Sequence, residues 1–156
     1  MDFRLNSYAT VYQLGHKAIA DIFSSPVVVE EKIDGSQLSM GVFNGELLCR
    51  SKGKQLIVDA PEKMFVEAIE TAKEVMPHMR EGWIYRCEYL KSPKHNALPY
   101  SRIPQKHLIV FDVAIGIEQY LAPAEKLVAT EELGLECVPV LYEGVVSDFE
   151  MFKAFL

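Results

Sequence analysis

The residues most able to do chemistry lie in one short run, Glu30-Glu31-Lys32-Ile33-Asp34-Gly35. They follow Val27-Val28-Val29, so four charged side chains stand where a buried strand should leave the core. Strand alternation would send Glu30, Lys32 and Asp34 to one face. One interpretation is a surface cluster of ion pairs. The other is a lysine nucleophile, which needs a low-dielectric surrounding and nearby cations to lose its proton near neutral pH.

The composition is that of an ordinary globular protein. The chain has 156 residues, 49% of them hydrophobic, and a net charge of −6. This composition excludes a disordered protein and predicts one domain over residues 1–156. No apolar run approaches the roughly 20 residues of a membrane-spanning helix. Three cysteines without metal-ligand spacing favour reduced thiols, so we expect a cytoplasmic location.

Hydrophobic periodicity predicts the elements that must position the charged run. Asn44-Gly45 is typical of a hairpin turn, which makes the first three strands antiparallel neighbours. Asp59 is the expected cap of one helix, with Pro61 in its first turn, and Ser147 with Glu150 the capping box of another. The expected strands are 27–34, 37–43, 46–52, 82–90, 107–115 and 138–144, and the expected helices are 13–23, 61–76, 123–133 and 147–156.

These elements predict an α+β fold built mainly from antiparallel sheet, flanked by helices. The last predicted helix runs to the final residue inside an apolar stripe. Natural domains usually tie down or fray their last residues, so we expect a truncated domain.

A basic strip interrupts the acidic chain. Residues 91–106 hold four basic side chains and no acidic one. Such a strip can meet nucleic-acid phosphates, although the charge alone favours a solvated loop.

Four segments, taken in order, resemble motifs of the covalent nucleotidyltransferases, the polynucleotide ligases and RNA-capping enzymes. Lys32-x-Asp34-Gly35 resembles their nucleophile motif. The later segments that resemble theirs are Arg50–Lys54, Arg86–Leu90 and Leu108–Val113. The stretch Lys94–Pro104 is similar to the loop joining the last two in phage-type ATP-dependent RNA ligases. The resemblance, over residues 8–146, implies the N-terminal part of an ATP-grasp-like ligase domain, phage-encoded and acting in host cytoplasm.

The resemblance implies an activity and a set of cofactors. Lys32 would attack ATP to form lysyl-AMP, and AMP would pass to an RNA 5′-phosphate before a 3′-hydroxyl joins the strands. Mg²⁺ is the expected cation, because it binds phosphate and carboxylate oxygens. The nucleotide would be held by Glu30, Glu31, Asp34, Gly35, Arg50, Glu88 and Phe111, and the RNA by Lys54, Lys91, Lys94, Arg102 and Lys106.

Within that set the resemblance implies separate roles. Arg50 would contact ribose and phosphate, Glu88 the ribose hydroxyls, and Phe111 the face of the adenine, while Glu30 or Glu31 would lie near its amino group. The simpler alternatives are an ion pair between Glu88 and Arg86 or Arg50, and a plain core role for Phe111.

The resemblance also leaves gaps. Two later motifs of the family, a Glu-Gly-x-x strand and a Lys-x-Lys strand, are expected to be missing, so we expect feeble or absent self-adenylylation. Gln37 stands where DNA ligases commonly carry arginine, which favours an RNA ligase over a DNA ligase fragment. A non-catalytic remnant that binds nucleotide or RNA is the remaining hypothesis.

Overall fold

The computed structural model describes residues 4–154, which fold into two compact units. The first unit combines the segment ending at Tyr8 with Ile33–Cys137. The second combines Ala9–Lys32 with the segment beginning at Val138. The single domain expected over residues 1–156 stays a prediction. Within the described residues, no helix is long and apolar enough to cross a membrane.

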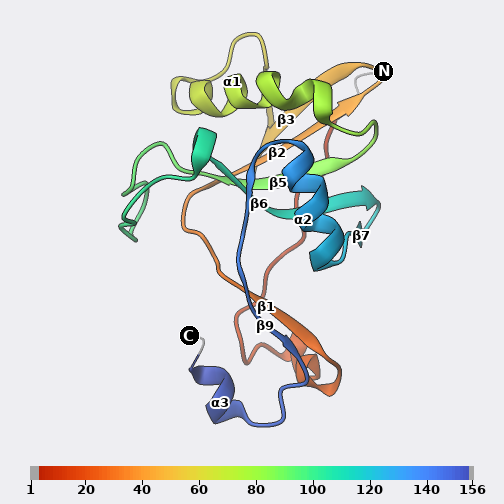
Figure 1. Ribbon diagram of the computed structural model, residues 1–156, viewed down its shortest axis with the longest axis vertical. Coiled ribbons are helices and arrows are strands. Elements are labelled where there is room, and N and C mark those ends of the chain that lie inside the picture. Colours follow the sequence, from red (N-terminus) through yellow and green to blue (C-terminus); the bar gives the residue numbers. More distant parts are fainter. Residues whose placement is uncertain (1–3, 155–156) are drawn as a thin grey trace. The chain divides into compact units, whose positions relative to one another are not determined.

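The first unit is built on a seven-stranded sheet in the order β4-β3-β2-β5-β6-β7, with β8 added beside β6 (Figure 1). Every pair is antiparallel except β6 with β8. The predicted α+β class with mainly antiparallel sheet is therefore confirmed. The strands are β2 (Ser36–Phe43), β3 (Glu46–Ser51), β4 (Gln55–Leu56), β5 (Ile84–Tyr89), β6 (Leu108–Gly116), β7 (Gln119–Tyr120) and β8 (Glu136–Cys137).

The β2–β3 hairpin turns at the predicted residues. Asn44 and Gly45 both have positive φ, 53° and 78°. A two-residue turn with both φ values positive matches the right-handed twist of the two strands, which is why Asn-Gly favours it.

Helix α1 (Val66–Val75) covers one face of the sheet (Figure 1). Its apolar stripe is buried as predicted, but its start is not at Asp59 and Pro61. Residues 57–60 form a turn, in which the Ala60 N–H donates to the Ile57 carbonyl, and a 3-10 turn, Lys63–Phe65, leads into the helix. The buried face of α1 consists of Ala68, Ile69, Thr71, Ala72 and Val75.

Helix α2 (Pro123–Glu132) agrees with the predicted helix 123–133. Pro123 stands in its first turn, where a missing N–H has no cost, and Gly134 follows with φ of 71°.

The second unit contains a two-stranded antiparallel sheet, β1 (Val27–Glu30) with β9 (Val140–Gly144). The expectation that β1 joins the β2–β3 hairpin is wrong, because β1 ends at Glu30 and pairs with β9. The predicted helix 13–23 forms only two 3-10 turns, Lys17–Ile19 and Ile22–Ser24.

Helix α3 (Phe149–Lys153) begins later than predicted. Asp148, and not Ser147, caps it, since the Asp148 carboxylate accepts the Glu150 N–H at 2.9 Å. The last two residues of the predicted helix lie outside the described residues.

The cysteines are expected to differ in reactivity. Cys49 and Cys87 are fully buried in the first unit, and burial raises the pKa of the Cys49 thiol to about 12 and also raises the pKa of Cys87. Since the thiolate is the reactive form, iodoacetamide at mildly alkaline pH should label the folded chain only at the partly exposed Cys137. Mass spectrometry would count the labels, with Cys137→Ser as control. A second label on the folded chain would contradict the prediction.

Candidate functional site

The predicted nucleophile lies in the second unit. Lys32 is exposed and is the last residue of Ala9–Lys32. β1 ends at Glu30, and the Glu31 N–H donates to the Pro139 carbonyl at 3.1 Å. The strand alternation expected to continue to Asp34 therefore stops before Lys32.

The Asp34 carboxylate binds a distant loop. Its Oδ2 accepts the backbone N–H groups of Ala97 and Leu98, at 3.1 and 3.0 Å. Its Oδ1 accepts the Asn96 side-chain amide at 3.4 Å, and the Asp34 N–H donates to the Tyr100 hydroxyl at 2.8 Å. Asp34, predicted to bind nucleotide, thus ties the connection between β5 and β6 to the start of β2.

Gly35 lies close to β5, where it contacts the Glu88 side chain and the Tyr89 backbone. Its N–H donates to Glu88 Oε2 at 3.1 Å. A Cβ at this position would stand 2.4 Å from the Tyr89 carbonyl oxygen, so the close approach requires glycine. Among the described residues, neither Arg50 nor Arg86 forms a hydrogen bond to Glu88. The alternative of an ion pair between Glu88 and one of these arginines is therefore not observed, and Glu88 accepts the Gly35 N–H.

A row of polar side chains crosses the sheet at the level of Ser39. The strand registers place Arg50 opposite Ser39, Ser39 opposite Arg86, and Arg86 opposite Asp112. The row thus spans β3, β2, β5 and β6 on the face opposite the apolar residues of β2.

Arg86, like Ser39, is fully buried in this row. It is 0% exposed, and its Nη1 donates to Ser39 Oγ and to the Asn6 carbonyl, both at 2.8 Å. Its Nη2 donates to Asn6 Oδ1 at 2.9 Å, and burial lowers the pKa of the guanidinium. Arg86 therefore fastens the N-terminal segment to the sheet.

Arg50 has fewer partners. Its Nη1 donates to the Leu5 carbonyl at 3.3 Å, and its buried Nε has no hydrogen-bond partner among the described atoms. A guanidinium offers five N–H donors, so Arg50 has spare donors for an anionic group such as a phosphate.

Phe111 sits at a β-bulge. Cys87 pairs with Val110 and Arg86 with Asp112, which leaves Phe111 as the extra residue of β6. Its half-buried ring meets the Tyr8 ring edge-on, with centroids 5.1 Å apart. A ring held in this way keeps part of its surface accessible, unlike a side chain enclosed in the core.

Two residues near Phe111 were not predicted from the sequence. The Tyr8 hydroxyl donates to Asp112 Oδ2 at 2.8 Å, and buried Lys126 donates to the Phe111 carbonyl at 3.0 Å. Nothing in the sequence around Tyr8 signals its position. Lys126 could have been found, because it shares the buried face of α2 with Ala129 and Thr130.

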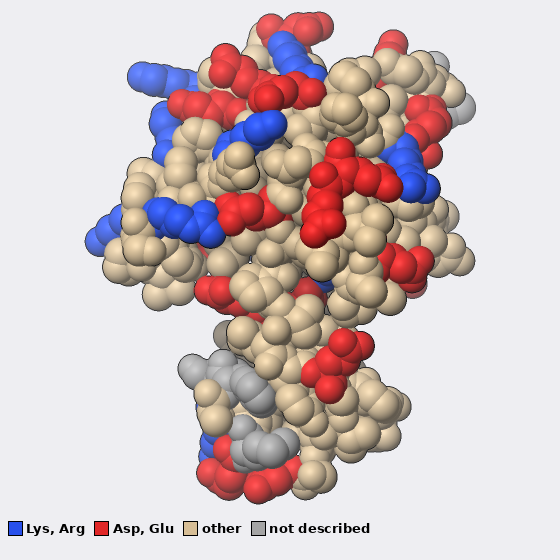
Figure 2. Space-filling model, viewed as in Figure 1, with Lys and Arg blue, Asp and Glu red and all other residues tan. Residues whose placement is uncertain are grey.

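The five predicted RNA-binding cations have different surroundings. Lys54 pairs with Glu62, Arg102 with Glu136 through two bonds of 3.0 and 2.7 Å, and Lys106 with Glu74 at 2.9 Å. Lys91 and Lys94 are exposed and form no ion pair within residues 4–154. On the face in Figure 2, basic side chains of the first unit lie beside acidic ones and make no continuous basic patch.

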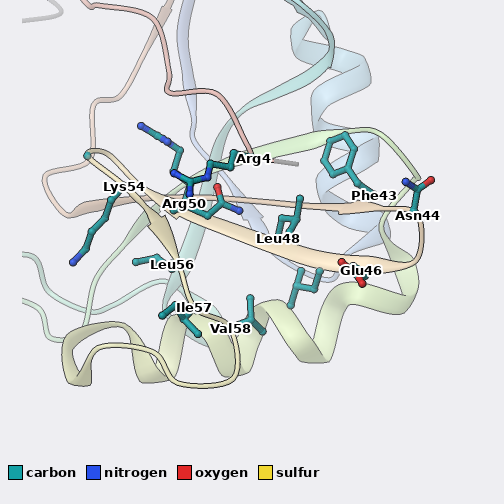
Figure 3. A pocket seen from close by; sticks show the side chains of 13 residues that line it. Arg4, Phe43, Asn44, Glu46, Leu48, Arg50, Lys54, Leu56, Ile57 and Val58 are labelled. Atoms are coloured by element: carbon teal, nitrogen blue, oxygen red, sulfur yellow. The ribbon is translucent and has the colours of Figure 1, made fainter. Parts of the chain in front are cut away.

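A cavity of about 720 Å³ lies along β3 and β4 (Figure 3). Of the predicted site residues it includes Arg50 and Lys54 but not Asp34, Glu88 or Phe111. Its other lining residues are Arg4, Phe43, Asn44, Glu46, Leu47, Leu48, Gly53, Gln55, Leu56, Ile57 and Val58.

The donors for a metal ion are sparse in the described part of the chain. No group of three or more His, Cys, Asp or Glu side chains in residues 4–154 is arranged to hold a metal ion. The Mg²⁺ that the resemblance implies stays a prediction.

Comparisons with known proteins place this fold. The chain resembles the solved structure of an archaeal ATP-dependent RNA ligase, with a TM-score of 0.62 and 16% identity, over 89% of this chain and 38% of that one. It also resembles a putative ATP-dependent DNA ligase from Aquifex aeolicus, with a TM-score of 0.59 and 17% identity, over 97% of this chain and 43% of that one. The chain thus spans about two-fifths of each.

A search of the curated proteins found no match. The decisive comparison is with a family model described as RNA ligase, which matches residues 25–155 and includes the whole Lys32-x-Asp34-Gly35 motif. The chain belongs to the RNA ligase family.

Proposed function

We propose that this chain carries the nucleotide-binding and nucleophile-bearing part of an ATP-dependent RNA ligase. The observation that carries the proposal is the RNA ligase family match over residues 25–155, which contains the Lys32 motif. The ATP dependence named for both similar structures supports ATP as the nucleotide.

The proposed reaction begins at Lys32. Its deprotonated Nζ attacks the α-phosphorus of ATP, a P–N bond forms, and the P–O bond to pyrophosphate breaks. The AMP group then passes to an RNA 5′-phosphate, which restores the lysine and makes a 5′–5′ pyrophosphate link. A 3′-hydroxyl attacks the RNA phosphate, and AMP leaves as the strands are joined.

The first unit would hold the nucleotide. The spare donors of Arg50 fit a phosphate or ribose oxygen, and the accessible surface of Phe111 fits the adenine ring. Glu88, beside Gly35, would accept the ribose hydroxyls. Mg²⁺ bound to the phosphates would neutralise their charge. No side chain of this protein is assigned as a Mg²⁺ ligand in the proposed reaction.

RNA would meet the chain mainly through Lys91 and Lys94. Both ammonium groups are exposed and keep no carboxylate partner in the described residues, so they can pair with phosphates. The substrate ends are an RNA 5′-phosphate and a 3′-hydroxyl. A DNA nick is the second candidate, which the likeness to the Aquifex aeolicus protein favours and Gln37 disfavours.

The test is covalent labelling. We expect the chain, incubated with Mg²⁺ and ATP labelled at the α-phosphate, to take up label slowly in an acid-labile phosphoramidate bond. ATP labelled at the γ-phosphate is the control and should leave no label. A folded chain that takes up no α-label would contradict adenylylation by this chain and leave the alternative, a non-catalytic chain that binds nucleotide or RNA.

A further inference from the structure

The turn that follows the proposed nucleophile is tied to one loop. Six hydrogen bonds join residues 34–36 to residues 95–100. Four of them involve Asp34. The fifth runs from the Asn96 amide to the Gly35 carbonyl at 2.7 Å, and the sixth joins Ser36 Oγ to His95 Nε2 at 2.8 Å.

His95 extends the connection to the base of the loop. The Lys91 N–H donates to His95 Nδ1 at 3.1 Å, so the neutral ring carries its hydrogen on Nε2 and donates to Ser36. Lys91 is thus linked to the turn through one imidazole ring. The Tyr100 N–H closes the loop on itself by donating to the Pro93 carbonyl at 2.8 Å.

Asp34 is the charged anchor of this network. One carboxylate oxygen accepts two successive backbone N–H groups that lie 63 and 64 residues away in sequence. Hydrogen bonds to an ionised acceptor are stronger than neutral ones, so the carboxylate contributes more than the amide contacts around it. Replacing it would release the loop from its only charged attachment among the six bonds.

The loop carries the two basic side chains that keep no ion pair among the described residues. Lys91 and Lys94 stand at its start, whereas Arg102 and Lys106 beyond it are paired with Glu136 and Glu74. The position of the two free ammonium groups relative to Gly35 and Ser36 therefore depends on the network.

We propose that Asp34 is a positioning residue, which acts through the 91–100 loop to place Lys91 and Lys94 for the 5′-phosphate of the RNA, and does not bind ATP. The proposal rests on the proposed function for its RNA substrate. It changes the role of Asp34 from the nucleotide contact that the motif resemblance implies to a link between the turn at residues 34–36 and the RNA.

The test compares Asp34→Asn and Asn96→Ala with Asp148→Asn. Asp148 also accepts a backbone N–H, but it lies in the second unit. Asp148→Asn therefore removes one negative charge without touching the 91–100 loop. The readouts are hydrogen exchange of peptides covering residues 93–101, ATP affinity by calorimetry, and affinity for one oligoribonucleotide with either a 5′-phosphate or a 5′-hydroxyl.

In Asp34→Asn we expect loop exchange to rise about tenfold or more, because a hydrogen bond to a charged acceptor stabilises by at least that factor. The preference for 5′-phosphate over 5′-hydroxyl RNA should be lost, while ATP affinity changes less than about twofold. Asn96→Ala should change exchange and 5′-phosphate preference in the same direction by a smaller factor, and Asp148→Asn should change neither. If Asp34 only stabilised the fold, its replacement would lower the affinities for both RNAs and for ATP alike.

Three results would overturn the proposal: reduced ATP affinity with unchanged loop exchange, a released loop with unchanged 5′-phosphate preference, or a wild-type chain with no such preference. None of these readouts requires covalent labelling. Failure of the proposed function would instead appear as a wild-type chain that takes up no α-label from ATP.

Discussion

Replacing Lys32 with alanine is expected to abolish covalent labelling of the chain by α-labelled ATP. The alanine variant has no amine to form the P–N bond, and a lysine elsewhere would lack the bound α-phosphate in line with it. Autoradiography of the denatured protein after incubation with Mg²⁺ and labelled ATP measures the effect.

Lys32→Arg distinguishes a nucleophile from a simple charge. Arginine keeps the positive charge but cannot be deprotonated in a protein, so this variant should bind ATP and remain unlabelled. Lys17→Ala removes an exposed lysine of the same unit and should label like the wild type. Label retained in Lys32→Ala would show that another residue is the nucleophile.

Gly35→Ala is expected to destabilise the first unit by about 3 kcal/mol or more, because overpacking against fixed backbone leaves no cheap relaxation. The added Cβ would stand 2.4 Å from the Tyr89 carbonyl oxygen and 3.2 Å from a methyl carbon of Leu90. The strain falls where the Gly35 N–H meets Glu88 and the Gly35 carbonyl meets Asn96.

Urea denaturation followed by the fluorescence of Trp83 measures this change, since Trp83 is the chain's one tryptophan and belongs to the first unit. Gly53→Ala is the matched control. A Cβ at Gly53 meets no atom within 4 Å, so its effect should stay within about 0.5 kcal/mol. Equal midpoints for the two variants would contradict the predicted clash.

The sequence predicted the elements that local chemistry determines. Asn44-Gly45 can form a tight hairpin turn whatever surrounds it, and Pro123 and Gly134 bound α2 through their own backbone preferences. The antiparallel α+β class follows from such local signals. The mistaken start of α1 at Asp59 shows their limit, because a turn at 57–60 competes for the same residues.

The arrangements that the sequence did not predict depend on partners far along the chain. Val28 pairs with Glu143, and no local pattern could show that β1 would join β9 and not β2. The ion pairs of the basic strip were not predicted, for the same reason. Arg102 and Lys106 pair with Glu136 and Glu74, which lie outside the strip in sequence. The motif pointed to Asp34, but its hydrogen bonds to Ala97 and Leu98 are visible only in three dimensions.

The contacts of the N-terminal segment bear on the order in which the chain can fold during synthesis. Asn6 bonds to Arg86 across 80 residues, and Tyr8 to Asp112 across 104. Asn6 and Tyr8 leave the ribosome well before these two partners, which follow with β5 and β6, and closing such long loops is slow. Asn6 and Tyr8 are therefore synthesised well before the side chains that hold them.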